Sequence, residues 1–434
     1  MSRLEQLAQT FLTRRRPGRA LTWLARTPVP VMAAEWFARQ APLDDDGVAS
    51  PSPFVENILP REAPPGILDG GVVIKDQIDV AGLRTGVGMA DGGELAQRDA
   101  TVVARIVAAG GRIVGKTKMT ELGVDGIGSV MHYPMPRNPV APGYAPGGSS
   151  TGTAVAVAAG LARYGVGGDG LGSVRIPSAF CGLVGLKPGQ RALPRDGIHT
   201  PVQTLAQIGP MTRTAADCVR LWQVMAGEPV TPLTAWTPST FGVPAFASAR
   251  VARSIRRAFD RMLGALAAEV REVPLPGLET VTFLGGMTGA HELASGPYAG
   301  CGTTTAGRTS LALGRSFSAS DIAALEAQRT ALREATERAF ARTPILAMPT
   351  TAIPPPAISP ALLAGKASIP LLRALGAFTP LANLVDLPAI AAPSGVDDRG
   401  RPLSIMFVAP PGGETSLLRL ALAAEATGLG SARV

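Results

Sequence analysis

Apolar residues recur along this chain with the two spacings that distinguish strands from helices. The run Gly71–Ile74 is short and continuously apolar, which predicts a buried strand. The segment 100–109 places valine and isoleucine at helical spacing, and Ile113–Val114 predicts the next strand. Because a strand, a helix and a second strand follow one another, this region predicts a β-α-β unit, the unit that builds parallel sheets.

The rest of the chain shows the same two patterns less regularly. The region 270–318 has weak periodicity with many Gly and Thr residues, and the Pro-rich residues 353–360 predict a loop. Further helices are predicted at residues 214–226, 248–268, 321–342 and 415–426, and further strands at 387–390 and 403–408. Either Ser320 or Asp321 is the expected N-cap of the helix at 321.

A glycine-rich stretch around position 160 is the strongest local signal. A Pro/Gly turn delivers Ser149 and Ser150, and the nearly uncharged run 151–162 predicts a helix buried on all sides. A second glycine-rich turn, residues 165–172, presents Ser173, and the three residues after it are expected to be extended. Two turns joined by one buried helix would bring two serine hydroxyls close together.

This arrangement resembles the amidase signature family, whose members use a Ser–cis-Ser–Lys triad. The resemblance begins with the motifs GGSS and GSVRIP and with Lys75 in the upstream apolar strand. It runs from about Gly71 to the C-terminus through further blocks in the family's order: Gly115-Lys116-Thr117, Arg137-Asn138-Pro139, Cys181-Gly182-Leu183-Val184-Gly185-Leu186-Lys187-Pro188, Gly209-Pro210-Met211, Met348-Pro349-Thr350 and Leu387-Pro388-Ala389-Ile390.

The resemblance implies an α/β fold, a single large domain whose central mixed β-sheet is covered by helices on both faces. An N-terminal helical segment, residues 1–60, is expected to pack on this core. Residues 61–434 are expected to form the amidase signature domain. Within it, the region of about 270–380 is expected to vary and to shape the substrate pocket.

The resemblance also implies catalytic roles: Ser173 is the nucleophile, Ser149 is the bridging serine in a cis peptide, and Lys75 is the base. A serine needs an adjacent base to become a good nucleophile. A lysine can act as that base only when it is neutral, and burial in an apolar strand lowers its pKa. Arginine could not serve, because it does not lose its proton. The implied path is acyl transfer to Ser173, release of ammonia or an amine, and hydrolysis of the ester.

The second turn carries the implied oxyanion hole, which would stabilise the developing negative charge. Its donors would be the backbone N–H groups of Gly170, Leu171, Gly172 and Ser173. Gly123 falls where the family contacts substrate through its backbone, and Ser149 is a second expected substrate contact. Asp169 and Arg175 are expected to brace the loop rather than to touch substrate.

Some positions depart from the family pattern and leave the substrate open. Leu171 stands where a small residue is usual, so it would be strained if that position required positive φ, and it would narrow the site. Thr151, Lys118 and Ala206 also replace the usual residues. None of these belongs to the implied triad.

Each implied catalytic residue also has an interpretation without chemistry. Ser149 alone would be an N-cap of the helix at 151, Lys75 alone would be a snorkelling or ion-paired lysine, and Ser173 alone would be a loop serine. The motif Gly165-x-Gly167-x-x-Gly170 fits a dinucleotide fingerprint, but no helix is predicted to follow it.

A rival interpretation is a nucleophile elbow centred on Ser150, with His199 or His291 as base. The residues before Gly148 form a Pro/Gly loop, however, and an elbow requires a strand there. The chain contains no Ser-x-x-Lys, so the penicillin-binding arrangement is excluded.

Composition narrows the class of protein. Charged residues make up 17% of the chain and hydrophobic residues 46%, and there is no apolar span of 18 residues, so no membrane partner is expected. The net charge of +8 comes chiefly from dispersed arginine, which argues against nucleic-acid binding. Three distant cysteines fit a reduced cytoplasm, and three histidines lack metal-ligand spacing. No metal and no cofactor are expected.

The leading hypothesis is an amide hydrolase acting on a small carboxamide. A second is an amidotransferase-type subunit that releases ammonia for a partner, and a third is a biosynthetic acyltransferase or a scaffold that kept the triad. The pattern at residues 2–15, an amphipathic helix, indicates either a segment packed on the domain or a surface for a partner or a homodimer.

Overall fold

The computed structural model describes residues 51–57, 63–245 and 251–430. The helix predicted at residues 2–15 and the expected domain boundary near residue 60 lie outside the described residues. Strand β1 (Phe54–Asn57) is described and pairs antiparallel with β5 (Arg112–Thr117), so the sheet already includes residues before position 60.

The fold is built on a mixed sheet of 11 strands in the order β1-β5-β2-β6-β8-β7-β12-β13-β11-β9-β10. A two-stranded ribbon, β3 with β4, lies apart from it. The other strands are β2 (Gly71–Lys75), β3 (Arg84–Thr85), β4 (Glu94–Leu95), β6 (Tyr164–Asp169), β7 (Val184–Lys187), β8 (Gln207–Thr212), β9 (Thr240–Pro244), β10 (Glu269–Val273), β11 (Ile345–Pro349), β12 (Ala389–Val396) and β13 (Pro402–Val408).

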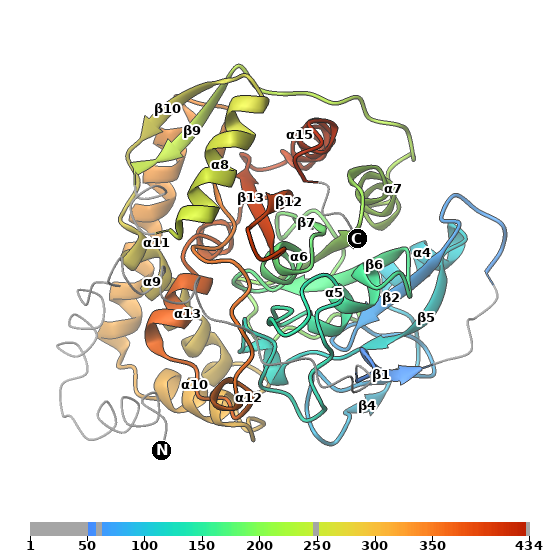
Figure 1. Ribbon diagram of the computed structural model, residues 1–434. Coiled ribbons are helices and arrows are strands. Elements are labelled where there is room, and N and C mark those ends of the chain that lie inside the picture. Colours follow the sequence, from blue (N-terminus) through green and yellow to red (C-terminus); the bar gives the residue numbers. More distant parts are fainter. Residues whose placement is uncertain (1–50, 58–62, 246–250, 431–434) are drawn as a thin grey trace.

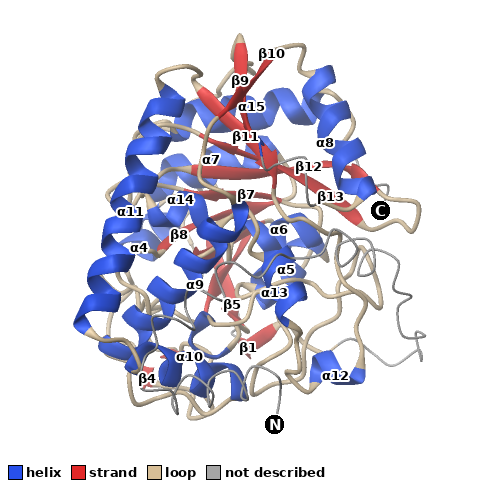
Figure 2. Cartoon of the chain, turned by 90° about the vertical axis from the view of Figure 1, so that its left-hand side faces the viewer, coloured by secondary structure: helices blue, strands red, loops and turns tan. Residues whose placement is uncertain are grey.

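Helices cover both faces of this sheet, as Figures 1 and 2 show. They are α4 (Thr101–Ala108), the 3-10 helix η1 (Glu121–Gly123), α5 (Thr151–Ala158), α6 (Arg175–Phe180), α7 (Ala215–Ala226), α8 (Arg253–Ala265), α9 (Leu278–Ser295), α10 (Thr305–Arg315), α11 (Ala319–Phe340), α12 (Pro360–Leu363), α13 (Ile369–Leu375), α14 (Pro380–Leu384) and α15 (Glu414–Ala426). The α/β fold with a mixed sheet between helices is therefore confirmed.

Strand β2 shows how the sequence sorts side chains between the two faces. Val72 and Ile74 belong to the core that α4, α7 and α15 cover, whereas Val73 belongs to the core around α5. Because strand side chains alternate, Lys75 points to the same face as Val73. The strand is parallel to β5 on one side and to β6 on the other, which confirms the predicted β-α-β unit.

The second glycine-rich segment was predicted to be a turn, and that prediction is wrong. Residues 164–169 form the buried strand β6, and only 170–173 turn. Its glycines serve close packing: a Cβ at Gly165 would lie 2.7 Å from Thr153 Cγ2 of α5, and one at Gly167 would lie 2.9 Å from Ser150 Oγ, just before α5, and 2.7 Å from Met211 Sδ. The glycines therefore let strand and helix approach rather than bend the chain.

The ends of neighbouring helices also differ from prediction. Helix α5 ends at Ala158 rather than 162, and Gly160 follows with φ +75°, a usual helix stop. Ser173 is followed by helix α6, not by an extended segment. Helix α11 begins earlier than expected, because Ser318 is its N-cap and forms a capping box with Asp321.

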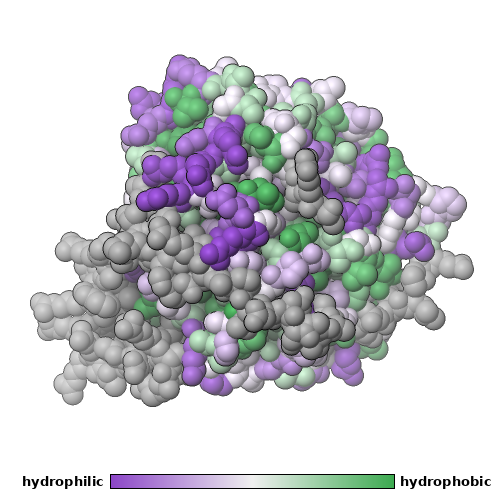
Figure 3. Space-filling model, viewed as in Figure 1, coloured by the Kyte–Doolittle hydropathy of each residue, from purple (hydrophilic) through white to green (hydrophobic). Residues whose placement is uncertain are grey.

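Some of the arginine is clustered on one helix rather than dispersed as expected. In Figure 3 hydrophilic residues gather over α8, whose outward face carries the exposed Arg253, Arg256, Arg257 and Arg261. Among the described residues, no helix is both long and apolar enough to cross a membrane.

Candidate active site

Lys75 ends strand β2 on the face covered by α5, and only 1% of it is exposed. Its Nζ donates hydrogen bonds to Ser149 Oγ at 2.8 Å and to the Gly168 carbonyl at 3.1 Å. In the described part of the chain it makes no ion pair. Burial lowers the pKa of Lys75 to about 7, although the charges of Asp169 and Asp76 oppose this by raising it. An amine with this pKa is largely neutral above neutral pH.

Ser149 lies in the loop before α5, and the Gly148–Ser149 peptide bond is cis. Its side chain is buried, and a Cβ at Gly123 would lie 3.3 Å from Ser149 Oγ. A side chain at Gly148 would collide with the carbonyl of Asp125, so this position admits only glycine. The structure therefore brings together three of the residues singled out from the sequence: Lys75, Ser149 and Gly123.

Ser173 lies between the turn 170–172 and helix α6, with 9% of its surface exposed. Its carbonyl accepts a hydrogen bond from Ser150 N at 3.3 Å, which ties the nucleophile candidate to the residue after Ser149. Ser150 Oγ in turn donates to the Gly168 carbonyl, the same acceptor that Lys75 uses. Within the described residues, Ser173 Oγ makes no hydrogen bond.

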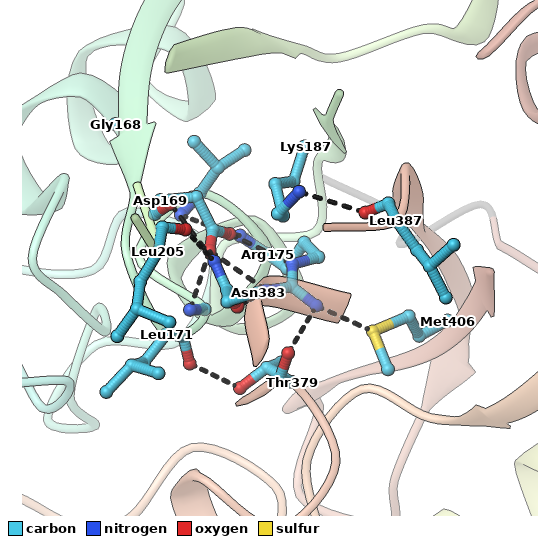
Figure 4. Close-up of polar contacts among 12 residues, drawn as sticks. Gly168, Asp169, Leu171, Arg175, Lys187, Leu205, Thr379, Asn383, Leu387 and Met406 are labelled. Carbon is cyan, nitrogen blue, oxygen red and sulfur yellow. Dashed lines mark hydrogen bonds and ion pairs between the residues drawn. The ribbon is translucent and has the colours of Figure 1, made fainter. Parts of the chain in front are cut away.

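The carboxylate of Asp169 organises the turn from inside (Figure 4). It accepts hydrogen bonds from Gly172 N at 2.7 Å and Val174 N at 3.1 Å, and it forms a fully buried ion pair with Arg175 at 2.9 Å. Burial raises the pKa of Asp169, but Arg175 and Asn383 outweigh this and hold it well below its usual range. This confirms that Asp169 and Arg175 brace the loop.

A distant segment completes the support of the turn, and sequence reasoning missed it. Arg175 donates to the Thr379 carbonyl at 2.8 Å and to Asn383 Oδ1 at 2.6 Å. Thr379 Oγ1 donates to the Leu171 carbonyl at 2.7 Å. The signal that could have revealed this was one threonine and one asparagine in the otherwise apolar run 377–385.

One of the four expected oxyanion donors is already occupied. The N–H of Gly172 points to Asp169, so Gly172 cannot donate to an oxyanion without losing that bond. The N–H groups of Gly170, Leu171 and Ser173 have no acceptor among the described residues. Three donors therefore remain where four were expected.

Gly172 is required for shape instead. Its φ is +127°, a conformation that side chains rarely adopt, and a Cβ there would collide with Thr379 Oγ1. Leu171 is not among the described non-glycine residues with positive φ, so the strain considered for it does not arise.

The competing interpretations find no support. Ser150 Oγ is fully buried and bonded to Gly168, and His199 Nε2 pairs with Asp79 at 3.0 Å. The His291 ring lies tilted against that of Phe317, with the ring centroids 6.5 Å apart, and within the described residues it makes no hydrogen bond to Ser150. Helix α5 is preceded by Ser150, not by Ser149, and its N-cap side chain makes no capping bond.

Two other lysines are fully buried and make different contacts. Lys116 Nζ donates to the Ile78 carbonyl at 2.6 Å and lies 3.9 Å from Asp76. Lys187 Nζ donates to the carbonyls of Pro188 and Leu387, and burial followed by the charge of Arg175 lowers its pKa to about 8. Lys116 Nζ also donates to a hydroxyl, Thr85 Oγ1 at 2.9 Å. Lys75 differs from Lys187 because its amine bonds to a hydroxyl, and from Lys116 because that hydroxyl belongs to Ser149 and no carboxylate pairs with the amine in the described part of the chain.

Other features of the described residues lie away from this cluster. A surface cavity of about 440 Å³ lies between residues 66–69, α7 and α15, and none of the candidate site residues lines it. No group of three or more His, Cys, Asp or Glu side chains within the described ranges could hold a metal ion.

Comparison with known proteins gives the chain's relatives. The family model described as Amidase matches residues 58–267 and 304–418, more than half of the chain. The unmatched segment between them, residues 268–303, lies at the start of the region expected to vary, and it contains all of α9.

Individual relatives come from two kinds of protein. A fatty acid amide hydrolase of Medicago truncatula is 32% identical over 402 residues, covering 83% of this chain and 65% of that protein, so the chain spans less than two thirds of that relative. A glutamyl-tRNA(Gln) amidotransferase subunit of Natronomonas pharaonis is 32% identical over 418 residues, covering 84% of this chain and 96% of that protein. A solved structure described as an amidase is 27% identical with a TM-score of 0.71, covering 98% of this chain and 99% of that one.

Proposed function

This chain belongs to the amidase family, which bears out the resemblance noted from its motifs, and from that premise we propose that it hydrolyses an amide C–N bond through an acyl-enzyme on Ser173. The observation that carries the proposal is the buried hydrogen bond of 2.8 Å between Lys75 Nζ and Ser149 Oγ. A lysine whose pKa burial lowers to about 7 can accept a proton near neutral pH.

In the first step Lys75 acts as base through Ser149. Ser173 Oγ attacks the amide carbonyl carbon, its proton passes to Ser149 Oγ, and the Ser149 proton passes to Lys75 Nζ. The carbonyl π electrons move to the oxygen, and the backbone N–H groups of Gly170, Leu171 and Ser173 stabilise this oxyanion. When the intermediate collapses, the C–N bond breaks, and the leaving nitrogen takes the proton back along the same relay.

The second step repeats the first with water as nucleophile. Water attacks the ester carbonyl carbon, and its proton passes through Ser149 to Lys75. The bond between the carbonyl carbon and Ser173 Oγ then breaks, and Ser173 recovers its proton from the relay. The products are a carboxylic acid and ammonia or an amine.

The protein's own side chains hold the turn in place. Asp169, Arg175 and Thr379 fix it by hydrogen bonds, which supports donors that need little reorganisation during the reaction. Such preorganised donors are worth about 10²–10³ in rate each in other hydrolases.

We propose a small carboxamide as substrate. The three cysteines are free thiols, which supports a reducing compartment such as the cytoplasm.

A second candidate function is that of an ammonia-releasing component of an amidotransferase, because the similarity spans 96% of the glutamyl-tRNA(Gln) amidotransferase subunit of Natronomonas pharaonis.

A tagged fluorophosphonate tests the nucleophile, since the phosphorus–fluorine bond breaks as the serine forms a phosphonate ester. Peptide mass spectrometry should place the label on Ser173, and Ser173→Ala should abolish both labelling and turnover while leaving the melting temperature near that of the wild type. Ser150→Ala is the matched control and should still be labelled. A label on Ser150 instead would refute the proposal.

Ammonia release from a panel of amides tests the reaction. Turnover of simple carboxamides by the isolated chain supports the hydrolase. Glutamine turnover that appears only after a partner co-elutes in size-exclusion chromatography would support the amidotransferase function instead.

A further inference from the structure

Leu171 has no role in the proton relay, but it belongs to the same turn as the candidate nucleophile, two residues before Ser173. It is half-buried, whereas its neighbours Gly172 and Ser173 are buried. The accessible part of the turn is therefore formed by Gly170 and Leu171. A substrate that places its carbonyl oxygen on the N–H groups of this turn must lie next to the Leu171 side chain.

The Leu171 side chain occupies a space that α9 leaves open. A Cβ at Gly285 would lie 3.3 Å from Leu171 Cδ2, and a Cβ at Gly289 would lie 3.2 Å from Leu171 Cδ1. These two buried glycines are one helical turn apart, so both present bare backbone to the leucine. The leucine and the helix are fitted to each other.

The Leu171 backbone is held just as firmly. Its carbonyl accepts the hydrogen bond from Thr379 Oγ1. The next residue, Pro380, packs against the same helix, because a Cβ built at Gly285 would lie 2.7 Å from Pro380 Cβ. The hydrogen bond to Thr379 fixes the backbone of Leu171, and α9 limits where its side chain can move.

We propose that Leu171 is a specificity-determining residue that limits the bulk of the substrate's acyl group close to the carbonyl carbon, so that unbranched acyl groups are accepted and branched ones are rejected. This inference rests on the proposed acyl transfer to Ser173. The reason is geometric: the N–H of residue 171 is a proposed donor to the carbonyl oxygen, so its side chain lies nearest to the first carbon of the acyl group.

Two p-nitrophenyl esters test this directly, one of butanoate and one of 2,2-dimethylpropanoate. Transfer of each acyl group to Ser173 Oγ breaks the ester C–O bond, and nitrophenolate leaves and is measured by its absorbance. The readout is the ratio of kcat/KM for the branched ester to that for the unbranched ester, with Ser173→Ala subtracted as background. Adding or removing one methylene group of a substrate in a tight apolar pocket changes the ratio of kcat/KM values by about 10–200-fold.

Leu171→Ala should raise the ratio at least about tenfold. Gly289→Ala should lower it, because the added methyl group presses Leu171 toward the substrate. Leu205→Ala is the matched control. This buried leucine also packs near Gly289, since a Cβ built at Gly289 would lie 4.0 Å from Leu205 Cδ1, but it lies outside the turn. The kcat/KM ratio of Leu205→Ala should therefore equal that of the wild type.

Folding and function are separated by two further measurements. Melting curves show which variants are folded, and the burst of nitrophenolate from the butanoate ester counts the active sites. If Ser173-dependent acylation is present but Leu171→Ala leaves the ratio unchanged, the inference about Leu171 is overturned while the proposed function stands. If neither ester acylates Ser173 in the wild type, the proposed function itself fails.

Discussion

Protonation of Lys75 is the perturbation that tests the relay most directly, because it changes one proton and no other atom. With a pKa of about 7, about 90% of the amine is neutral at pH 8 and about 9% at pH 6. With the ordinary value of 10.5, only about 0.3% would be neutral at pH 8. Burial therefore raises the fraction of usable base about 300-fold at that pH.

The expected result is a kcat/KM that rises about tenfold per pH unit up to an inflection near 7 and is flat above it. The assay is initial rate at low substrate between pH 5 and 10, with an uncharged amide that does not titrate in this range. Lys75→Met should lose most activity and also lose the inflection. Lys187→Met is the matched control, because Lys187 is equally buried but bonds only to carbonyls, and its variant should keep an inflection near 7.

The same pKa makes a prediction about stability. The folded-state pKa of Lys75 is lowered, so between pH 7 and 10.5 the unfolded chain binds a proton that the folded protein does not, and stability rises with pH across that window. The full effect is about 5 kcal/mol, from a difference of about 3.5 between the two pKa values. In Lys75→Met this rise should disappear. An activity inflection near 10, or one near 7 that survives in Lys75→Met, would refute the neutral-lysine mechanism.

Two further substitutions test the supports of the site. Gly172→Ala should lower kcat by about 10²-fold or more. Alanine rarely adopts a φ of +127°, and its methyl group would collide with Thr379 Oγ1, so the turn must move. Steady-state kinetics together with a melting curve will show whether the loss is catalytic. Glu121→Gln should lower the melting temperature and reduce the free energy of unfolding in urea by about 2–4 kcal/mol. The two oxygens of the buried carboxylate accept hydrogen bonds from the N–H groups of Thr303 and Thr304, at 2.9 and 2.8 Å, whereas an amide can accept at only one atom. An unchanged melting temperature would contradict this.

Local patterns were sufficient for the elements that carry Lys75 and Ser149, but not for those on either side of Ser173. The apolar run before Lys75 predicted strand β2, and the alternation of strand side chains then placed the amine on the face that α5 covers. The buried helix after Ser149 was also predictable from its lack of charge, apart from its end. Periodicity and apolar composition are properties of neighbouring residues, so the sequence alone reveals them.

Glycine content was the least reliable guide to local structure. Glycines permit both a turn and a close approach between packed elements. Which of the two occurs at 165–168 depends on distant residues such as Thr153 of α5 and Gln77, and no local pattern contains that information.

The sequence by itself determined which chemical groups this protein has available: a lysine in an apolar strand, and two serines in glycine-rich segments. Only the tertiary structure decided how they work together. It brought Lys75 Nζ to 2.8 Å from Ser149 Oγ, gave the N–H of Gly172 to Asp169, and brought in Thr379 from about 200 residues further along the chain. The physical reason is that burial and long-range hydrogen bonds depend on packing between distant segments, whereas local conformational preference depends only on neighbours.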